Sequence, residues 1–533
     1  MFILVEERME INTFIKSVSR VSARVAYVYP STYRAMISSL APDIVYVLLN
    51  SMEEVFVERF ACTRLYGPEE LPRSLETKSP LKDFKLILTT LHYEPDIVNL
   101  ARLLLAGGLS VLSRDREEHV VIAGGPACME NPVPYSDVVD ACVIGEAEAT
   151  LPEVISLWMS YGDKKKRFLE ELARLDYVYI AGYDKEKVVK RHVSDLDTSF
   201  YPIRQVENTE VEPVYGRGFK LEVSRGCPFW CSFCIETRVF QPYRERSPGV
   251  LAKLVEEGMK YSIGGKRVVL YALAFPVSRD NAKLLEYLSS EGYRASIPSL
   301  RATPLLEKYA EVIKQLGQRT LTIAPESFSP TIQRALFKYV GVLDYLNQLL
   351  ERLLQVGFDL KLYLIYGFKG LESVDDIKLN ASYIKKLVEL AKKYKRRVSV
   401  SLNPLIPKPH TIFQWIGMMG VEELAAVLRE YRNLLRGVAE YRLLDIDWAV
   451  VQAQLALSTK PLGGFIKKWA EYGGSLAGWR RAVRELGVDY KYVFTGYKSD
   501  EELPWSSIDL GGEVEKVTAS QYHTYKKVTS ART

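Results

Sequence analysis

Two stretches of this chain alternate short apolar runs with amphipathic runs, a pattern typical of α/β folds. The first spans residues 24–161, where the segments PDIVNLARLLLAGG and EATLPEVISLW have helical spacing. The expected buried strands there are RVAYVYP, DIVYVLL, FKLILTTL, HVVIAGG and DACVIG. This alternation predicts an N-terminal, doubly wound parallel sheet of the Rossmann-like kind.

In the second stretch the alternation restarts with six further strand candidates, at 219–224, 267–272, 293–298, 319–324, 360–365 and 396–402. Between them lie helical segments around 248–262, 279–290, 304–316, 341–356 and 374–394. Six units predict a partial (β/α)6 barrel, because a closed barrel of this kind needs eight.

The pattern divides the chain into five parts. We expect an N-terminal arm (1–19), a doubly wound domain (20–190), a polar linker (191–218), a partial barrel (219–420) and a helical C-terminal region with a flexible tail (421–533). The tail is expected to be flexible because its last dozen residues are polar and rich in Thr, Ser and Lys.

Composition narrows the class of protein. A chain of 533 residues with 47% hydrophobic and 26% charged residues is long and apolar enough for several folded domains. A net charge of +5 does not indicate a nucleic-acid groove, although RNA stays possible. Neither a signal peptide nor a membrane-spanning run is visible, so we expect a cytoplasmic protein with no membrane partner.

Three of the six cysteines, Cys227, Cys231 and Cys234, form a C-x3-C-x2-C array directly after the first barrel strand. Three thiolates can bind three irons of a [4Fe-4S] cube and leave the fourth iron open for another ligand. The alternatives are a zinc knuckle and unligated core cysteines. Structural zinc takes four ligands, and neither a fourth cysteine nor a histidine is nearby.

This array resembles the signature of the radical S-adenosylmethionine (SAM) superfamily. The resemblance implies that the open iron binds SAM, whose reductive cleavage gives a 5'-deoxyadenosyl radical, with flavodoxin or ferredoxin as electron donor. It also places Phe233 near the adenine of SAM.

Other residues at expected barrel strand ends are candidates for binding this cofactor: Tyr271, Arg301, Glu326, Tyr366, Gly367 and Asn403. Arg301 could clamp a carboxylate, and Glu326 could accept ribose hydroxyls; each could equally be a capping or ion-pairing residue. The family's Gly-Gly-Glu-like run is absent, since Tyr271 begins the run YALA there. We therefore assign neither recognition of the SAM amine nor a catalytic residue.

The N-terminal runs IAGGPACMENP and DACVIGEAEATLPEV resemble the cobalamin-binding domain of class B radical SAM proteins. Candidate residues at these strand ends are Gly124, Gly125, Gly145 and Glu146, although glycine there also suits a simple tight turn. The classical Asp-x-His-x-x-Gly loop is missing, because Pro30–Arg34 stands in its place. The domain either binds cobalamin or is a degenerate scaffold.

These features predict a radical SAM enzyme that modifies a C–H position of an unknown substrate, with cobalamin-dependent methylation as the leading reaction. One alternative is a methylthiotransferase with a second cluster on Cys62, Cys128 and Cys142; buried structural cysteines are the simpler interpretation of these three. Another is a binding protein that a metal only stabilises. His410, the lone histidine of the barrel half, is either a packed residue or a catalyst.

Overall fold

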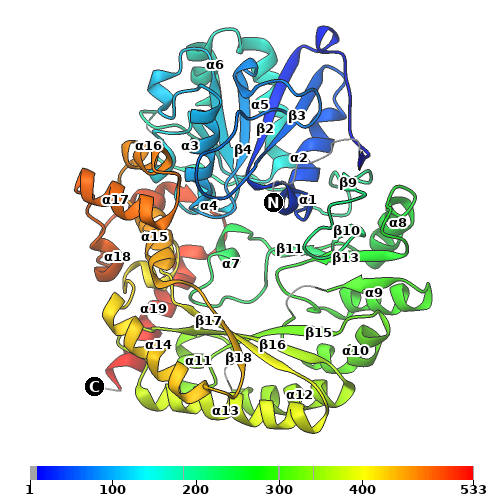
Figure 1. Ribbon diagram of the computed structural model, residues 1–533, viewed down its shortest axis with the longest axis vertical. Helices are drawn as coiled ribbons and strands as arrows, with labels where there is room; N and C mark the ends of the chain where they lie inside the picture. The colour runs from blue at the N-terminus through cyan, green and yellow to red at the C-terminus, as the bar shows by residue number, and fades with distance from the viewer. Residues whose placement is uncertain (1–8, 184, 298–299, 340, 532–533) are drawn as a thin grey trace.

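The structure of the protein is a computed structural model, which describes residues 9–183, 185–297, 300–339 and 341–531. Figure 1 shows the N-terminal sheet above, the barrel strands below, and C-terminal helices along one side of both. Residues 1–8 of the expected N-terminal arm and Pro298 and Ser299, at the end of the third expected barrel strand, lie outside the described residues.

The N-terminal half is built on one six-stranded sheet. Its strands lie in the order β3 (Val55–Cys62), β2 (Ala23–Thr32), β4 (Leu86–Thr90), β5 (Val120–Gly124), β6 (Ala141–Val143) and β7 (Val178–Tyr179). All neighbours are parallel except β6 and β7. After β2 the chain adds β3 on one side and β4 on the other, so the topological switch point lies between β2 and β4.

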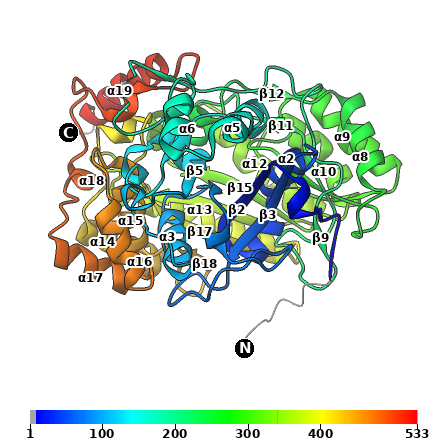
Figure 2. The same ribbon diagram turned by 90° about the horizontal axis from the view of Figure 1, so that it is seen from above.

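Helices cover both faces of this sheet, as Figure 2 shows from above. They are α1 (Tyr33–Ile37), α2 (Ala41–Asn50), α3 (Asp96–Ala106), α4 (Pro126–Glu130), α5 (Ala147–Tyr161) and α6 (Lys165–Leu172). The doubly wound expectation is confirmed, with one correction. The run DIVYVLL forms helix α2 instead of a strand, and the second strand of this sheet in chain order is β3.

The second half contains seven parallel strands in two sheets. The first sheet contains β10 (Phe219–Glu222), β13 (Arg267–Tyr271) and β14 (Arg294–Ser296). The second contains β15 (Thr320–Glu326), β16 (Asp359–Tyr366), β17 (Val398–Pro404) and β18 (Glu440–Leu443). A parallel bridge between Leu300 and Ile323 joins the two sheets. All six expected strands are present, and β18 adds a seventh within the region expected to be helical.

The barrel helices follow their strands in βα order. They are α7 (Glu236–Val239), α8 (Pro248–Gly258), α9 (Arg279–Ser290), α10 (Pro304–Gln315), α11 (Pro330–Leu336), α12 (Leu343–Val356), α13 (Val374–Lys393) and α14 (Val421–Leu435). Ser247, Ser278, Thr303, Ser329 and Ser373 each accept a backbone N–H at the start of the helix that follows them.

Five further helices complete the C-terminal region: α15 (Ile446–Leu457), α16 (Gly463–Glu471), α17 (Leu476–Leu486), α18 (Tyr492–Thr495) and α19 (Val514–Ser530). Helix α16 packs against α3 of the N-terminal half, and α19 packs against α11 of the barrel. The expectation that the last dozen residues are flexible is wrong for 522–530, because these residues belong to α19, whose Thr518, Gln521 and Tyr525 are buried against the barrel.

Short strand pairs tie distant parts of the chain together. They are β1 (Glu10–Ile11) with β9 (Glu207–Asn208), β8 (Val188–Val189) with β19 (Ile508–Asp509), and β11 (Ser224–Arg225) with β12 (Arg244–Glu245). None of the described helices is both long and apolar enough to span a bilayer. One apolar cluster runs from the N-terminal sheet into the barrel, so the two halves share a core.

Candidate functional site

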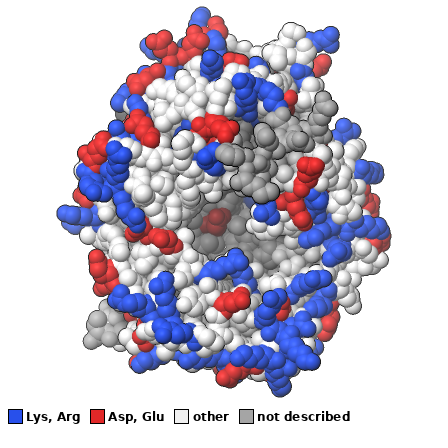
Figure 3. Space-filling model, viewed as in Figure 1, with Lys and Arg blue, Asp and Glu red and all other residues white. Residues whose placement is uncertain are grey.

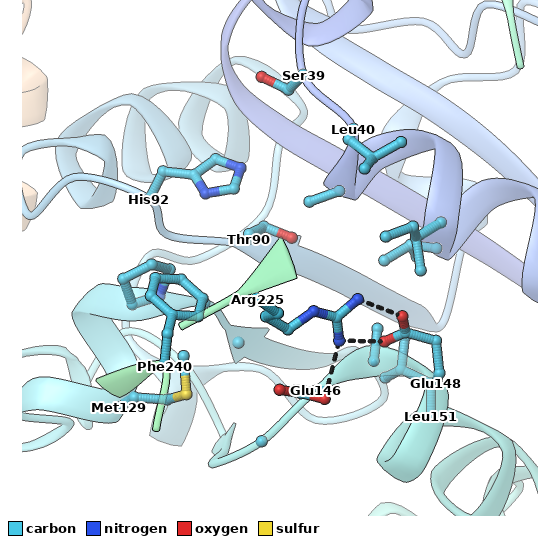
Figure 4. Close-up of a pocket in the computed structure, with 18 of the residues that line it drawn as sticks. Ser39, Leu40, Thr90, His92, Met129, Glu146, Glu148, Leu151, Arg225 and Phe240 are labelled. Atoms are coloured by element: carbon cyan, nitrogen blue, oxygen red, sulfur yellow. Dashed lines mark hydrogen bonds and ion pairs between the residues drawn. The ribbon is translucent and has the colours of Figure 1, made fainter. Parts of the chain in front are cut away.

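A cavity of about 450 Å³ lies between the N-terminal sheet and the barrel. The carboxyl ends of β4, β5 and β6 and the start of α2 form one wall, and residues of β10, β11 and β13 form the opposite wall. Figure 4 shows Ser39, Leu40, Thr90 and His92 on the first wall and Arg225 between the walls. Open α/β sheets bind ligands at this edge, next to the switch point.

All four predicted N-terminal residues, Gly124, Gly125, Gly145 and Glu146, line this cavity. A Cβ on Gly125, whose φ is +97°, would lie 2.8 Å from the carbonyl oxygen of Leu91. A Cβ on Gly145 would lie 2.4 Å from the carbonyl oxygen of Arg191. The chain's own packing therefore requires glycine at these two positions, whether or not a ligand also approaches them.

Glu146 forms an ionic clasp between the two halves. Arg225, from β11, bonds Glu146 at 2.8 Å, Glu148 at 2.8 Å and Glu222 at 2.9 Å, and Figure 4 shows its contacts to Glu146 and Glu148. Arg244 adds a second contact to Glu146 at 2.6 Å. Burial alone would raise the pKa of Glu146, but the Arg244 hydrogen bond and the Arg225 charge outweigh it and lower that pKa.

Tyr271, at the end of β13, lines the opposite wall of the cavity. Its hydroxyl donates a hydrogen bond to the carbonyl oxygen of Ser38, in the turn before α2. Burial raises the pKa of this phenol, so it stays protonated and keeps its donor role. Tyr271 therefore links the barrel to the N-terminal half at the cavity.

The cysteine loop, residues 226–240, begins where the cavity ends, because Gly226 lines the cavity and precedes Cys227. Gly226 has φ +83°, and a Cβ there would lie 2.5 Å from the carbonyl oxygen of Phe240. Only glycine lets the two ends of the loop approach so closely. Gly226, the first residue of the loop, thus allows the loop to close onto Phe240.

Side chains hold the loop by the backbone carbonyls of its cysteines. Arg238 donates to the carbonyls of Cys231 and Cys234, and Gln241 donates to that of Cys227 at 3.0 Å. Gln521 of α19 accepts from Arg238 at 2.6 Å and donates to the carbonyl of Trp230. The C-terminal helix therefore braces the cysteine loop.

None of the three thiols is in a disulfide. Burial raises the pKa of the Cys227 thiol, and it raises the pKa of the Cys234 thiol to about 12. Among the described residues, no three His, Cys, Asp or Glu side chains are grouped to hold one metal ion. In a [4Fe-4S] cube each thiolate binds a different iron, so the sulfurs need not converge on one point. The free thiols on one braced loop thus fit a cluster.

Two predicted barrel residues, Arg301 and Glu326, lie beside this loop, and the predicted Phe233 lies within it. The guanidinium of Arg301 is 3.9 Å from the sulfur of Cys231 and stacks on Phe229, 3.6 Å from the ring centroid. Glu326, whose φ is +64°, pairs with Lys338 at 2.7 Å. The Lys338 ammonium is 5.7 Å from the ring centroid of Phe233. Cations and aromatic rings therefore border the thiols.

Tyr366, Gly367 and Asn403 lie at the ends of β16 and β17, and none of them lines the cavity. Tyr366 is fully buried, and the Gly367 N–H donates to Glu372. His410 is buried too, with Nε2 3.1 Å from the carbonyl oxygen of Glu130. These contacts give His410 a packing role at the junction of barrel and sheet.

Cys62, Cys128 and Cys142 are all buried in the apolar core of the N-terminal half. Cys128 and Cys142 form a hydrogen-bonded thiol pair, and none of the three cysteines lines the cavity. Their burial in the apolar core, away from the cavity, fits structural cysteines better than ligands of a second cluster.

Sequence reasoning missed three residues of this region: His92, Arg225 and Lys338. Arg225 lies two residues before Cys227, so its nearness to the motif was a usable signal. His92 and Lys338 gave none, because both follow unremarkable apolar runs. Figure 3 shows the surface hollowed between the two halves, with Lys and Arg gathered over the barrel below.

Fold and loop together define an α/β enzyme scaffold with a cysteine array at the mouth of a partial barrel. Residues 41–181 match the family described as radical SAM proteins, N-terminal, and residues 221–379 match the radical SAM superfamily. The chain belongs to the radical SAM superfamily and is an enzyme of that group.

The chain is similar to several known proteins. Uncharacterised protein MJ0966 of Methanocaldococcus jannaschii is 31% identical over 73% of this chain and 79% of its own length. Bacteriochlorophyllide d C-8(2)-methyltransferase of Chlorobaculum tepidum is 30% identical over 26% of this chain and 28% of its own. The radical SAM methyltransferase TsrM of Kitasatospora setae, solved with cobalamin and a [4Fe-4S] cluster, shares the fold, with a TM-score of 0.52 and 13% identity over 87% of this chain and 100% of that one.

Proposed function

We propose that this protein is a cobalamin-dependent radical SAM methyltransferase that methylates an unreactive carbon of a substrate still to be identified. One observation carries the proposal: a single cavity is bounded both by the ligand-binding edge of the N-terminal sheet and by Gly226, the neighbour of Cys227. A ligand in the cavity would therefore lie next to the cysteine loop.

Cys227, Cys231 and Cys234 would hold the cluster. When bound, the cluster supplies the electron that cleaves SAM, and the corrinoid supplies a carrier for the methyl group. Arg238 and Gln241 keep the three cysteine carbonyls in place, so the loop stays in one shape. Arg301 and Lys338 add positive charge beside the thiols, where the carboxylate of SAM would find a partner.

The cavity fits a corrinoid in its chemistry. Most of its wall area is apolar, with side chains such as Leu40, Leu88 and Ile122, and polar side chains that include Ser39, Thr90 and Glu148 lie among them. The apolar area suits the face of a corrin ring, and the polar side chains can hydrogen-bond the amide groups at its edge. Two similar proteins support the proposal, since the Chlorobaculum tepidum protein is a methyltransferase and TsrM was solved with cobalamin bound.

The electron for SAM cleavage would come from a flavodoxin or a ferredoxin. Substrate would enter between the cavity and the cysteine loop. A methylthiotransferase activity is disfavoured because Cys62, Cys128 and Cys142 are packed in the core and Cys128 pairs with Cys142.

The test is anaerobic reconstitution with iron, sulfide and hydroxocobalamin, followed by dithionite and methyl-labelled SAM. We expect formation of 5'-deoxyadenosine and transfer of label to a component of a fractionated cell extract. Protein reconstituted without iron is the control. An intact cluster that neither cleaves SAM nor transfers its methyl group would refute the proposal.

A further inference from the structure

The second barrel sheet has two unlike faces. Along β16, partly exposed positions alternate with buried ones, so Lys361 and Tyr363 are accessible while the leucines between and beside them are buried. These leucines belong to the apolar core that includes residues of α12 and α13, the helices drawn below the strands in Figure 1. Because side chains alternate along a strand, Lys361 and Tyr363 face the inside of the barrel, its lumen.

Strand register extends this polar face across the sheet. Tyr363 lies opposite Ser401 of β17, and Ser401 lies opposite Arg442 of β18. The residues on either side of Arg442 pack against the apolar core, so Arg442 itself faces the lumen. The ammonium of Lys361 lies 4.9 Å from the centroid of the Tyr363 ring. Four side chains on strands about 4.8 Å apart therefore form one group, which we call the lumen row: Lys361, Tyr363, Ser401 and Arg442.

Within the described residues, the chain provides no polar partner for the side chains of the lumen row. Neither Lys361 nor Arg442 forms an ion pair, and neither Tyr363 nor Ser401 forms a side-chain hydrogen bond. Glu440, an acid on the same face of β18, lies nearer the amino end of the strand and pairs with neither cation. All four side chains of the row can donate hydrogen bonds and two are cations, so only solvent or an acceptor-rich ligand can satisfy them.

The inner polar side chains of the first barrel sheet are used differently. Lys220 of β10 pairs with Asp43 of α2, and Tyr271 of β13 donates to the carbonyl oxygen of Ser38. Both contacts join the barrel to the N-terminal half. The lumen row makes no such contact, so holding the two halves together does not explain its two cations.

The lumen row lies close to the cysteine loop. Leu364, the neighbour of Tyr363, is the register partner of Glu326. Glu326 pairs with Lys338, whose ammonium is 5.7 Å from the ring centroid of Phe233 in the loop. Tyr363 is three residues before the end of β16, which is about 10 Å of strand. The row does not line the interdomain cavity, so a ligand on it would approach the loop from the barrel side.

We propose that the lumen row binds an oxyanion of the substrate, a carboxylate or a phosphate, with Lys361 and Arg442 as its charged partners. The guanidinium and the ammonium suit such oxygens, and Tyr363 and Ser401 add neutral donors between them. The inference rests on the proposed function and names its substrate class. The substrate is a small anionic molecule whose charged end lies about 10 Å from the strand ends, so that its reacting carbon reaches the cysteine loop.

The charge of the methylated product tests the substrate class. Protein reconstituted with iron, sulfide and hydroxocobalamin is given dithionite, methyl-labelled SAM and cell extract, and the small molecules are passed over an anion-exchange resin at neutral pH. SAM is a cation and methionine is a zwitterion, so neither is retained. We expect a retained, labelled small molecule.

Other outcomes separate this inference from the proposed function. Label only in a neutral or cationic small molecule, or only in a macromolecule, would overturn the inference and leave the methyltransferase proposal intact. Label in nothing but SAM and methionine would defeat the proposed function, and this inference with it.

Variants test the two cations. Lys361→Met and Arg442→Met should each raise the KM for the retained substrate on the order of tenfold, with a smaller change in kcat, because each removes one charged partner. Lys361→Glu should raise it further, since it repels an anion. Lys386→Met is the matched control, because Lys386 is an exposed lysine on the outer helix α13, and its KM should match the wild type. KM values of both lumen variants equal to that of the control, at equal iron content, would overturn the assignment.

Discussion

The two candidate cofactor regions are built in opposite ways. The interdomain cavity is an apolar space of about 450 Å³ whose shape comes from strand ends and packed glycines. The cysteine loop is closely packed, and arginine and glutamine side chains bind its cysteine carbonyls. The first region offers preformed room for a large ligand. The second is a loop held in one shape by side chains, and its three thiols would be the ligands of an iron–sulfur cluster.

The two regions meet at β10 and β11. Arg225 reaches from the start of the cysteine loop to Glu146 and Glu148 at the end of β6 and the start of α5. Arg225 is therefore one of the contacts through which a displacement of one region reaches the other, together with Arg244 and Tyr271. This predicts that substitutions divide into those that affect the cluster, those that affect the cavity and those at the joint that affect both.

The largest effect is expected at the thiols. Cys231→Ala should reduce the iron content from about four atoms per chain to background and abolish SAM cleavage, because a cube cannot be held by two thiolates. Cys128→Ala, an equally buried cysteine in the N-terminal core, should keep the cluster and cost about 1 kcal/mol of stability. Iron analysis and 5'-deoxyadenosine formation measure both. Full activity of Cys231→Ala would show that this thiol is not needed to hold a cluster.

The next largest effect is expected at the joint. Arg225→Met leaves three buried carboxylates without their shared partner and should lower the free energy of unfolding by about 3–5 kcal/mol. Arg174→Met is the control, because it removes the ion pair between Arg174 and Glu171. The Arg174 side chain is 68% exposed, so this change should lower the free energy of unfolding by only about 0–1 kcal/mol. Urea unfolding gives both values. Equal losses of unfolding free energy in the two variants would show that Arg225 does not hold the two halves together.

The buried His410, at the junction of the barrel and the N-terminal sheet, should make the stability of the protein depend on pH. Burial lowers the pKa of His410 to about 4. Between pH ~6.5 and ~4 this histidine is therefore protonated in the unfolded chain and neutral in the folded protein. Stability should therefore fall as pH drops from ~6.5 to ~4, by up to about 3 kcal/mol from this residue. His410→Gln should remove that part of the slope. Parallel wild-type and variant curves of stability against pH would contradict the assignment.

The smallest effect is expected at the cavity wall. Gly125→Ala puts a Cβ 2.8 Å from the carbonyl oxygen of Leu91 at a positive φ, and should cost about 1–3 kcal/mol. Gly124→Ala is the neighbouring control, because its Cβ would meet nothing nearer than 3.7 Å and should cost under ~0.5 kcal/mol. Thermal unfolding compares them. Similar costs would mean that packing does not require glycine at position 125.

Strand and helix periodicity predicted the fold well where apolar residues alternate regularly. It failed on DIVYVLL, because a short apolar run cannot be told from a buried helix. It missed β3 because that strand carries Glu58 and Arg59 in its middle, and these are buried only through ion pairs with Arg24, Glu10 and Glu76. Long-range pairing of this kind leaves no local signal in the sequence.

The same limit explains what was found and missed in the candidate site. The cysteine loop was visible because its three ligands lie within eight positions. The cavity was visible only as glycine-rich strand ends. The role of α19 was hidden, since Gln521 acts on a loop almost three hundred residues away and its helix is polar in composition.

The most direct test of the whole account is the metal content of one preparation. The protein is reconstituted anaerobically with iron, sulfide and hydroxocobalamin and passed through gel filtration, and cobalt and iron are measured in the protein peak. We expect about four irons and about one cobalt per chain. Four irons with no retained cobalt would show that the interdomain cavity does not hold a corrinoid and would contradict the proposed cobalamin dependence.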